Sequence, residues 1–225
     1  MTIKLSEIIP LGRRANEYIG MFGLTEAEQL LRILDCGGGP SSFNAEMTAR
    51  GSRVVSVDPL YRYPTEKIKE RFDATFDDIM SQTENNRESF VWNIIKDPVD
   101  LRRRRKSAME LFLKDYERGK TGMRYLGGEL PVLSFADKEF DIALSSHFLF
   151  LYDHILDLAY HLKAISEMLR VAREVRIFPL QSLDVKMSPH LESVIEKFSA
   201  DGYETERVKV EYEFQKGSNE YLRIR

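Results

Sequence analysis

The chain has a single cysteine, Cys36, among its 225 residues. One thiol can form no intramolecular disulfide and supplies neither a CxxC pair nor a Cys/His zinc motif, so the sequence predicts a reducing, cytoplasmic environment and no metal site. Long apolar runs are missing as well, and the first residues lack the basic segment and apolar stretch of a signal peptide. We therefore expect a protein without a membrane span.

An excess of charge of one sign is also absent, because the formal net charge is −3. This value excludes a global attraction to nucleic acid. The charge is unevenly distributed, however: residues 101–124 hold nine basic and three acidic side chains, including the run RRRRK at residues 102–106. Such a run can bind the phosphates of RNA or of a phosphorylated metabolite, or it can form the solvated face of a helix.

Apolar runs and amphipathic segments alternate along the chain, which predicts strands and helices in turn. Strands are expected at residues 32–36, 54–59, 123–126, 140–145 and 174–178. Helices are expected at 41–50, 66–80 and 155–169, and another with Ser188 as its N-cap and Pro189 at its first position. This order predicts a mostly parallel, three-layer α/β sandwich.

Two further segments complete the expected architecture. Alternating residues at 208–214, a turn at 217–219 and the run 221–224 predict a C-terminal antiparallel hairpin. About 64 residues separate the second and third strands, whereas a simple crossover unit needs about 30. We therefore expect one domain over residues 1–225, with an N-terminal lid or helical region at 1–31 and a helical cap inserted at about 85–120.

A candidate ligand site follows the first two strands. The first ends in Cys36 and continues into three glycines, which allow the backbone to approach a ligand, and Asp58 ends the second, 19 residues after Gly39. An acidic side chain in that position can accept hydrogen bonds from both hydroxyls of a ribose. A dinucleotide motif would need a third glycine at position 42, which is Ser42, so a dehydrogenase is the less favoured alternative.

These segments resemble the class I S-adenosylmethionine-dependent methyltransferases. Residues 33–39 (ILDCGGG) resemble the first motif of that family, with Ser41 where a third glycine is usual, and Val57 with Asp58 resembles the second. Residues 128–141 (GELPVLSFADKEFD) match a third pattern without a gap, with Glu129 in place of the usual Asp. The pairs at 12–13, 17–18 and 21–22 resemble a bacterial group of methyltransferases.

The resemblance implies a seven-stranded Rossmann-like sheet and S-adenosylmethionine as the cofactor. It places Glu129 and Leu130 at the adenine, and the residues after the fourth strand beside the methyl group. The residues expected to bind the cofactor are Asp35, Cys36, Gly37, Gly38, Gly39, Ser41, Asp58, Pro59, Glu129, Leu130, Ser145 and Ser146. His147 is the candidate catalytic residue, as a general base on the substrate side, and the alternative is a structural histidine.

The methyl acceptor is expected to be a small molecule. The DNA amino-methyltransferases carry an Asn/Asp-Pro-Pro-Tyr/Phe motif where this chain has SSHF at residues 145–148, and Cys36 is misplaced for a nucleophile. One alternative is an RNA or protein methyltransferase that grips its substrate with the basic run. Another is a module that binds S-adenosylmethionine without catalysis. Arg13 and Tyr18 are expected to close over the cofactor, unless they belong to an ordinary amphipathic helix; no oligomeric state is predicted.

Overall fold

The computed structural model describes residues 8–225, which form a seven-stranded sheet with the order β3-β2-β1-β4-β5-β7-β6. All strands run parallel except β7, which is antiparallel to both of its neighbours. The strands are β1 (Arg32–Cys36), β2 (Arg53–Val57), β3 (Tyr125–Leu126), β4 (Phe140–Ser146), β5 (Ala172–Phe178), β6 (Thr205–Lys209) and β7 (Glu220–Ile224). The mostly parallel sheet with a C-terminal antiparallel hairpin confirms the predicted fold class.

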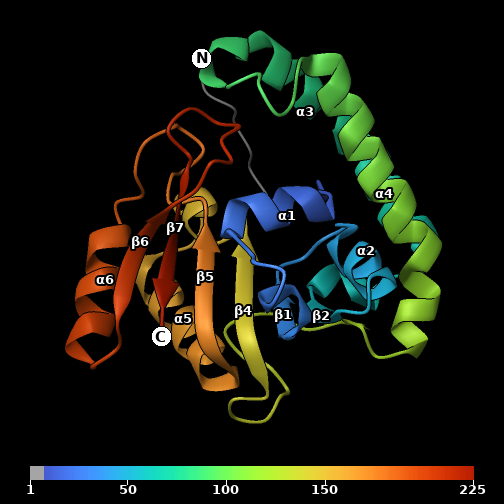
Figure 1. Cartoon of the computed structure of the whole chain (residues 1–225). Helices are drawn as coiled ribbons and strands as arrows, with labels where there is room; N and C mark the ends of the chain where they lie inside the picture. Colours follow the sequence, from blue (N-terminus) through green and yellow to red (C-terminus); the bar gives the residue numbers. More distant parts are fainter. Residues whose placement is uncertain (1–7) are drawn as a thin grey trace.

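Helices cover both faces of this sheet (Figure 1). The helices are α1 (Ala15–Phe22), α2 (Phe43–Ala49), α3 (Thr65–Asn85), α4 (Pro98–Thr121), α5 (Leu158–Val171) and α6 (Leu191–Ala200), with short 3₁₀ turns η1 (Glu28–Leu30), η2 (Pro59–Arg62), η3 (Arg87–Ser89) and η4 (Phe150–Tyr152). Helices α1 and α2 pack on one face, and α5 and α6 pack on the other. None of the helices within residues 8–225 combines the length and apolarity of a membrane span.

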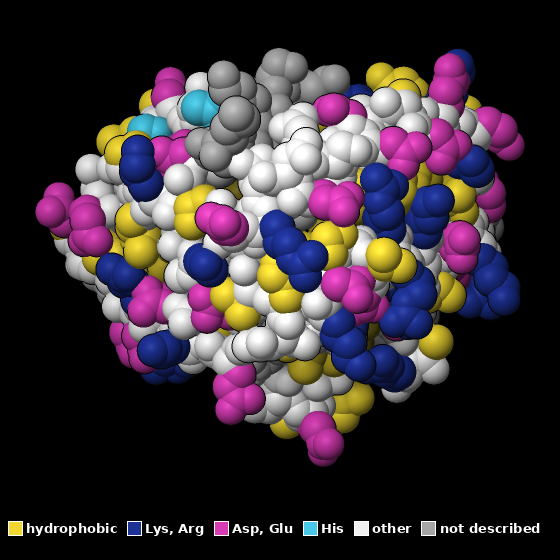
Figure 2. All heavy atoms as spheres, turned by 90° about the horizontal axis from the view of Figure 1, so that it is seen from above, with side chains coloured by type: hydrophobic (Ala, Val, Ile, Leu, Met, Phe, Trp, Pro, Cys, Tyr) yellow, Lys and Arg dark blue, Asp and Glu magenta, His cyan; other side chains and the backbone are white. Residues whose placement is uncertain are grey.

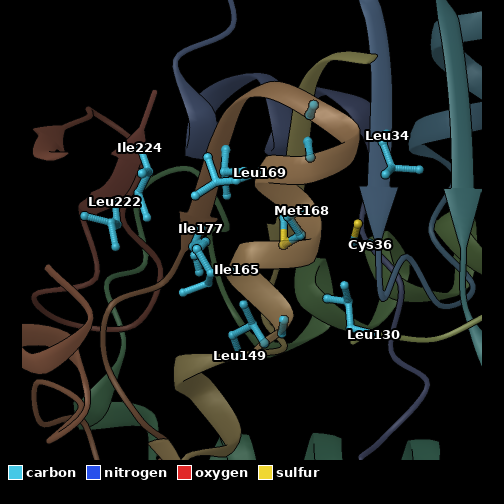
Figure 3. Close-up of a cluster of buried hydrophobic side chains, with 14 of the residues drawn as sticks. Leu34, Cys36, Leu130, Leu149, Ile165, Met168, Leu169, Ile177, Leu222 and Ile224 are labelled. Carbon is cyan, nitrogen blue, oxygen red and sulfur yellow. The ribbon is translucent and has the colours of Figure 1, made fainter. Parts of the chain in front are cut away.

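The two faces arise from the alternation of side chains along each strand. In β1, Leu34 and Cys36 point toward α5, whereas Ile33 points toward α1 and α2. Figure 3 shows the first of these layers, in which Met168 and other apolar residues of α5 meet the strands. Burying a side chain of this size contributes about 1.5–3 kcal/mol, so the apolar contacts on each face fix the strands in register.

The long helix α4 lies between β2 and β3 in the sequence, as predicted for the helical insertion. Asp97 caps its N-terminus, because the Oδ1 atom accepts a hydrogen bond from Asp100 N at 2.7 Å, and Pro98 occupies its first position. Phe112 and Tyr116 bury their rings against η2 and β3. In Figure 1 the connection between α3 and α4 extends beyond the carboxyl ends of β4 and β5.

Most predicted elements differ from the structure by a few residues at their ends, as α3 and α5 do, and two further differences lie near the C-terminus. The last helix begins at Leu191 with His190 as its N-cap, whereas the sequence predicts Ser188 as the N-cap and Pro189 as the first residue. Residues 188–191 form a turn before the helix, in which the Ser188 carbonyl accepts a hydrogen bond from Leu191 N. Strand β6 ends at Lys209, so residues 210–214 lie outside the sheet. There Phe214 stacks on Phe90 with ring centroids 4.8 Å apart. Residues 1–7 of the expected N-terminal lid lie outside the described residues.

Candidate functional site

The glycine turn after β1 brings bare backbone to the carboxyl end of the sheet. Gly37 and Gly39 have φ angles of 71° and 52°, in the left-handed region that favours glycine. At Gly38 an added Cβ would lie 2.3 Å from Asp35 Oδ2 and 2.8 Å from the Tyr61 hydroxyl. The turn therefore requires glycine for its conformation and for its packing, and it leaves the backbone open above Gly39, where a Cβ would meet nothing within 4 Å.

Asp58 follows β2 and is fixed beside this turn. Its Oδ2 atom accepts a hydrogen bond from Gly39 N at 2.9 Å, and its Oδ1 atom accepts one from Leu60 N at 2.8 Å. Each carboxylate oxygen has two acceptor positions, so both oxygens retain capacity for a ligand hydroxyl. Burial raises the pKa of Asp58, while the two backbone donors oppose that rise. The carboxylate is thus oriented in advance, as a ribose-binding acid requires.

A cavity of about 430 Å³ opens at the carboxyl ends of β1, β2 and β4. Strand order reverses between β1 and β4, which is where open α/β sheets bind ligands. The volume falls within the range of about 300–1,000 Å³ that is typical of small-molecule sites. The predicted residues that line this cavity are Cys36, Gly37, Gly38, Gly39, Asp58, Pro59, Glu129, Leu130, Ser146 and His147.

Three predicted site residues, Asp35, Ser41 and Ser145, do not line this cavity. Asp35 is buried beneath the glycine turn, where its Oδ1 accepts from the Tyr18 hydroxyl at 3.3 Å and its Oδ2 accepts from Ser56 Oγ at 3.0 Å. Burial raises the pKa of Asp35 to about 7. The Ser41 Oγ donates to Arg13 O at 2.9 Å. Asp35 and Ser41 thus support the turn from below and beside it.

Ser145 is fully buried, and its Oγ has no hydrogen-bond partner. Neighbouring residues of a strand point to opposite faces, so Ser145 and Ser146 cannot both face one cavity. Ser146 lines the cavity, and Ser145 points into the α5 layer with Ala143. The prediction that both serines line the cofactor site is therefore wrong for Ser145, because the alternation of side chains along β4 turns it to the other face.

Glu129 and Leu130 line the same cavity from the loop after β3. Glu129 is exposed, and its Oε1 lies 3.3 Å from Arg62 Nη2. Leu130 is buried and supplies an apolar wall; its carbonyl accepts from the Tyr160 hydroxyl at 3.0 Å. The pair therefore offers one acidic group at the rim and one apolar side chain inside, a combination suited to a heteroaromatic ring.

Cys36 is buried at the end of β1, and burial raises the pKa of its thiol well above the ordinary value. A protonated, enclosed thiol is a poor nucleophile, which agrees with the expectation that Cys36 does not act as one. Within residues 8–225, no three His, Cys, Asp or Glu side chains converge as the ligands of a metal ion would.

His147 lies where β4 ends and has a φ of 53°. Its backbone N–H donates to Phe178 O at 2.6 Å, and its Nδ1 lies 3.0 Å from Ser146 Oγ. Burial lowers the pKa of His147 well below the ordinary value, and the nearby Arg13 and Arg105 lower it further. The ring is therefore neutral at pH 7. It lines the first cavity and also a second one of about 110 Å³.

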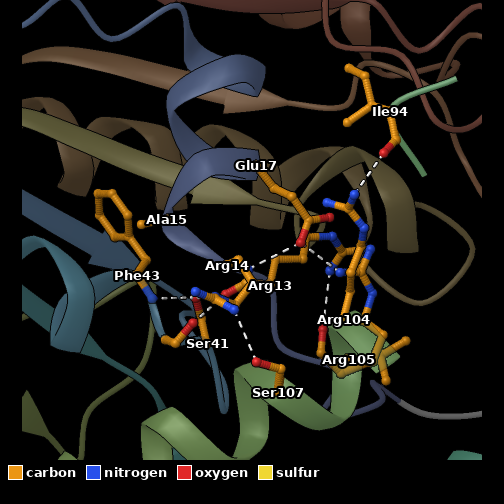
Figure 4. Close-up of polar contacts among 12 residues, drawn as sticks. Arg13, Arg14, Ala15, Glu17, Ser41, Phe43, Ile94, Arg104, Arg105 and Ser107 are labelled. Atoms are coloured by element: carbon orange, nitrogen blue, oxygen red, sulfur yellow. Dashed lines mark hydrogen bonds and ion pairs between the residues drawn. The ribbon is translucent and has the colours of Figure 1, made fainter. Parts of the chain in front are cut away.

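The N-terminal segment forms one side of both cavities. Tyr18 of α1 lines the first cavity and stacks on Phe43, with ring centroids 4.3 Å apart. Arg13, just before α1, lines both cavities. Figure 4 shows Glu17 directed toward Arg105 of α4, and its Oε2 lies 2.8 Å from Arg105 Nη1. This ion pair is buried and joins α1 to the inserted helix.

The arginines of the basic run form ion pairs with acidic side chains of the same chain. Arg102 pairs with Asp77 at 2.6 Å, and Arg103 and Arg104 both pair with Asp100. Arg105 is in the interior with Glu17. Figure 2 shows the end of the molecule at the strand carboxyl termini, where Lys and Arg side chains on the α4 side lie among Asp and Glu side chains. The run is therefore a set of internal and surface ion pairs, not an uninterrupted basic patch.

Several residues that line the first cavity were not predicted from the sequence. They are Ile8, Ile9, Pro10, Leu11, Leu60, Tyr63, Arg71, Leu133, Phe148, Leu156 and Tyr160. Phe148 and Leu133 could have been found, since they are the last residues of the SSHF and GELPVL segments. Residues 8–11 and Tyr160 carry no motif, and only the tertiary structure brings them to the site.

Comparisons with known proteins identify a relative. The chain is 35% identical over 228 residues to "Uncharacterized protein MJ0045" of Methanocaldococcus jannaschii, a match that covers 99% of this chain and 98% of that protein. This relative is archaeal, so it gives no support to the expected bacterial group. No protein-family model matches the chain.

Solved structures with a similar fold have a lower sequence identity to this chain. The N-methyltransferase NodS from Bradyrhizobium japonicum is 14% identical, with coverage of 93% of this chain and 92% of its own and a TM-score of 0.48. The magnesium protoporphyrin IX methyltransferase ChlM from Synechocystis is 10% identical, with coverage of 93% and 79% and a TM-score of 0.47.

Proposed function

The chain belongs to the family of MJ0045 from Methanocaldococcus jannaschii, and from the geometry of its site we propose that it is an S-adenosylmethionine-dependent methyltransferase with a small-molecule acceptor. One observation carries the proposal: the glycine turn and the Asp58 carboxylate line a single cavity at the reversal of strand order. The motif resemblance in residues 33–39, 57–58 and 128–141 supports the same cofactor.

The residues present fit this cofactor. In the proposal, Asp58 accepts hydrogen bonds from the ribose hydroxyls, the backbone of Gly37 to Gly39 lies against the nucleoside, and Leu130 contacts the adenine. Pro59 and Glu129 complete the nucleoside end of the cavity. Bound S-adenosylmethionine supplies an electrophilic methyl group on a sulfonium sulfur.

The contribution of the chain to catalysis is then mainly alignment. Holding an acceptor in line with the methyl group is worth up to about 7–11 kcal/mol relative to reaction in free solution. His147 stands on the wall between the two cavities and is neutral, so it is the candidate to receive a proton from an acceptor that must lose one. We further propose that residues 8–13 form the lid and that α4 with its preceding loop forms the cap over the acceptor.

Calorimetric titration with S-adenosylmethionine tests the cofactor assignment. We expect Asp58→Asn to weaken binding at least about tenfold, because a hydrogen bond to a charged group is worth about 1.5–3 kcal/mol. Asp201→Asn, which changes an exposed acid paired with Lys197 after α6, is the matched control and should bind as the native chain does. Unchanged affinity in Asp58→Asn, or tighter binding of NAD than of S-adenosylmethionine, would show that the site is assigned wrongly.

A labelled-methyl assay against extracted metabolite, RNA and protein fractions tests catalysis separately. Transfer to the metabolite fraction is expected. Binding without transfer to any fraction would instead indicate a module that binds the cofactor without catalysis, and transfer to RNA or protein would contradict the small-molecule acceptor.

A further inference from the structure

The second cavity lies on the far side of Arg13 and His147 from the proposed methyl donor. The two cavities share Ile9, Leu11, Arg13 and His147. The remaining walls of the second come from α3, α4, η4, the end of β5, Phe90 and the loops around residues 183 and 212–218. A molecule in this cavity would thus meet the donor across the shared wall, beneath the inserted helices.

The body of this cavity is apolar and small. Six of the side chains that enclose it are Ile79, Met80, Leu101, Leu151, Leu183 and Phe214. Its volume of about 110 Å³ is below the roughly 150 Å³ of a cavity that holds benzene. A short aliphatic chain therefore fits this space better than an aromatic ring.

The charges at its inner end are positive. Arg13 and Arg105 both line the cavity, and none of its described lining residues is acidic. The nearby Glu17 pairs with Arg105, whereas Arg13 has no carboxylate within ion-pair distance among residues 8–225. Its Nη1 donates to Leu11 O, and its Nε is buried without a hydrogen-bond partner. Two guanidinium groups thus lie near one carboxylate, and only that of Arg105 forms an ion pair with it.

Arg13 is half-buried, with its Nε atom enclosed. A cation in such a position without a counter-charge is costly, and an anion is the group that relieves the cost. Burial and the charge of Arg105 lower the pKa of Arg13 to about 10, as expected for such a cation. An ammonium group on the ligand would be repelled by the same two guanidinium groups. The site therefore favours a ligand that carries an anion and no cation.

Resting on the proposed function, we infer that the methyl acceptor is a small monocarboxylic acid with a short aliphatic body, and that its carboxylate oxygen is the atom methylated. The body fills the second cavity, and the carboxylate binds Arg13 at the shared wall, facing the donor. Because Arg13 is on that wall, the anionic end of the acceptor is also the end nearest the methyl group.

The reaction balances without a base. A lone pair of the carboxylate oxygen forms the bond to the methyl carbon, the carbon–sulfur bond breaks, and its electron pair stays on sulfur. A cationic donor and an anionic acceptor become a neutral thioether and a neutral methyl ester, and no proton moves. A neutral His147 is compatible with this chemistry, and the ester loses the charge that bound it to Arg13.

The test titrates the full chain, with and without S-adenosylhomocysteine, with linear and branched monocarboxylates of three to six carbons. The amines and alcohols of the same shapes serve as comparisons. At least one carboxylate should bind at least about tenfold more tightly than its matched amine and alcohol, since one charge-assisted pair is lost in these. In the labelled-methyl assay, the product should release its label as volatile methanol after alkali, as a methyl ester does.

Two variants separate the parts of the inference. Arg13→Met should weaken carboxylate binding at least about tenfold in the titration without cofactor, with Arg102→Met as the matched control. Leu183→Trp fills the second cavity from a half-buried loop position and should block the acid while leaving the donor site intact. Circular dichroism and thermal melts confirm that each variant is folded.

Several results would overturn the inference while leaving the methyltransferase proposal in place. They are equal binding of the amine or alcohol, binding of none of the acids, an alkali-stable product, or an Arg13→Met variant that binds the acid as the native chain does. Failure to bind S-adenosylmethionine contradicts the proposed function instead, and the acid titration without cofactor still tests the cavity by itself.

Discussion

The carboxyl group of Asp35 is held in the protein interior without a cationic partner. Its two hydrogen-bond donors are the neutral hydroxyls of Tyr18 and Ser56, and burial raises its pKa from 3.8 to about 7. The folded chain therefore binds a proton at this position that the unfolded chain has released above pH 4. Stability from this group is greatest at low pH and is lost as the pH rises from about 4 to about 7.

Replacing the acid by its amide removes this pH dependence. We predict that Asp35→Asn gains free energy of unfolding relative to the native chain when the pH is raised from 5 to 8, with an upper limit of about 3 kcal/mol, because about two units of the pKa rise lie within this pH range. Urea unfolding of both proteins at the two pH values measures the difference. A difference that stays constant, or that changes in the opposite direction, would show that Asp35 is ionised in the folded chain.

Individual site residues were predictable from the sequence where a local motif identifies them. They were not predictable where the tertiary structure determines whether a side chain lines the cavity or is buried. Gly37, Gly39 and Asp58 belong to short motifs after apolar runs, and they line the cavity. Asp35 belongs to the same glycine motif and Ser145 to the end of the fourth strand, yet both side chains are turned into the interior. Arg105 could not be distinguished from its basic neighbours, because its burial depends on the meeting of α4 with α1.

At the scale of elements, the ion pair between Glu17 and Arg105 joins two helices that lie far apart in the chain. Both side chains are almost fully buried, and Tyr212 donates to Glu17 Oε1 at 3.2 Å from the segment after β6. Desolvation opposes ionisation of Glu17, but the charge of Arg105 prevails and lowers its pKa. Three separate segments of the chain therefore depend on one carboxylate.

Removing that carboxylate should be far more costly than removing a surface pair. We predict that Glu17→Gln lowers the free energy of unfolding by about 3–5 kcal/mol, because it leaves Arg105 buried without a counter-charge. Asp77→Asn, which breaks the exposed pair with Arg102, should cost at most about 1 kcal/mol. Guanidinium unfolding measures both variants; similar costs for the two would contradict the buried pair as the connection between α1 and α4.

The C-terminal hairpin shows where element prediction reached its limit. Alternation of apolar and charged residues through 208–214 is typical of a strand, and the first part of it forms β6. Tyr212 and Phe214 keep the alternation but bury their rings elsewhere, against Glu17 and against Phe90 with Trp92. Phe90 and Trp92 lie in the insertion and Glu17 lies in α1, so these partners are all more than one hundred residues away in the sequence.

At the scale of the whole molecule, the uneven distribution of charge raises the question of whether the basic run binds a polyanion such as RNA. The net charge of −3 gives no general attraction, and the arginines at 102–105 each have a carboxylate partner within the fold. We predict that a fluorescent single-stranded RNA binds only weakly, at the nonspecific level of about 10⁻⁴–10⁻⁶ M, and that replacing Arg102 and Arg103 by Ala changes its affinity less than twofold.

Fluorescence anisotropy at 50 and 200 mM salt is the measurement, since phosphate contacts make binding fall steeply with salt. A steep salt dependence that the double replacement removes would restore RNA as the acceptor class. Lys209→Ala on the edge strand β6, remote from the insertion in sequence, is the control for a general loss of positive charge.

The two edges of the sheet differ in how they end. On one side β3 has only two residues, and α4 packs beside it. On the other side β6 carries Glu206, Arg207 and Lys209 as exposed side chains. A short edge and a charged edge are poor templates for a strand from another molecule. We therefore expect the chain to resist intermolecular β-pairing and the growth of fibrils at high concentration, for reasons independent of any ligand.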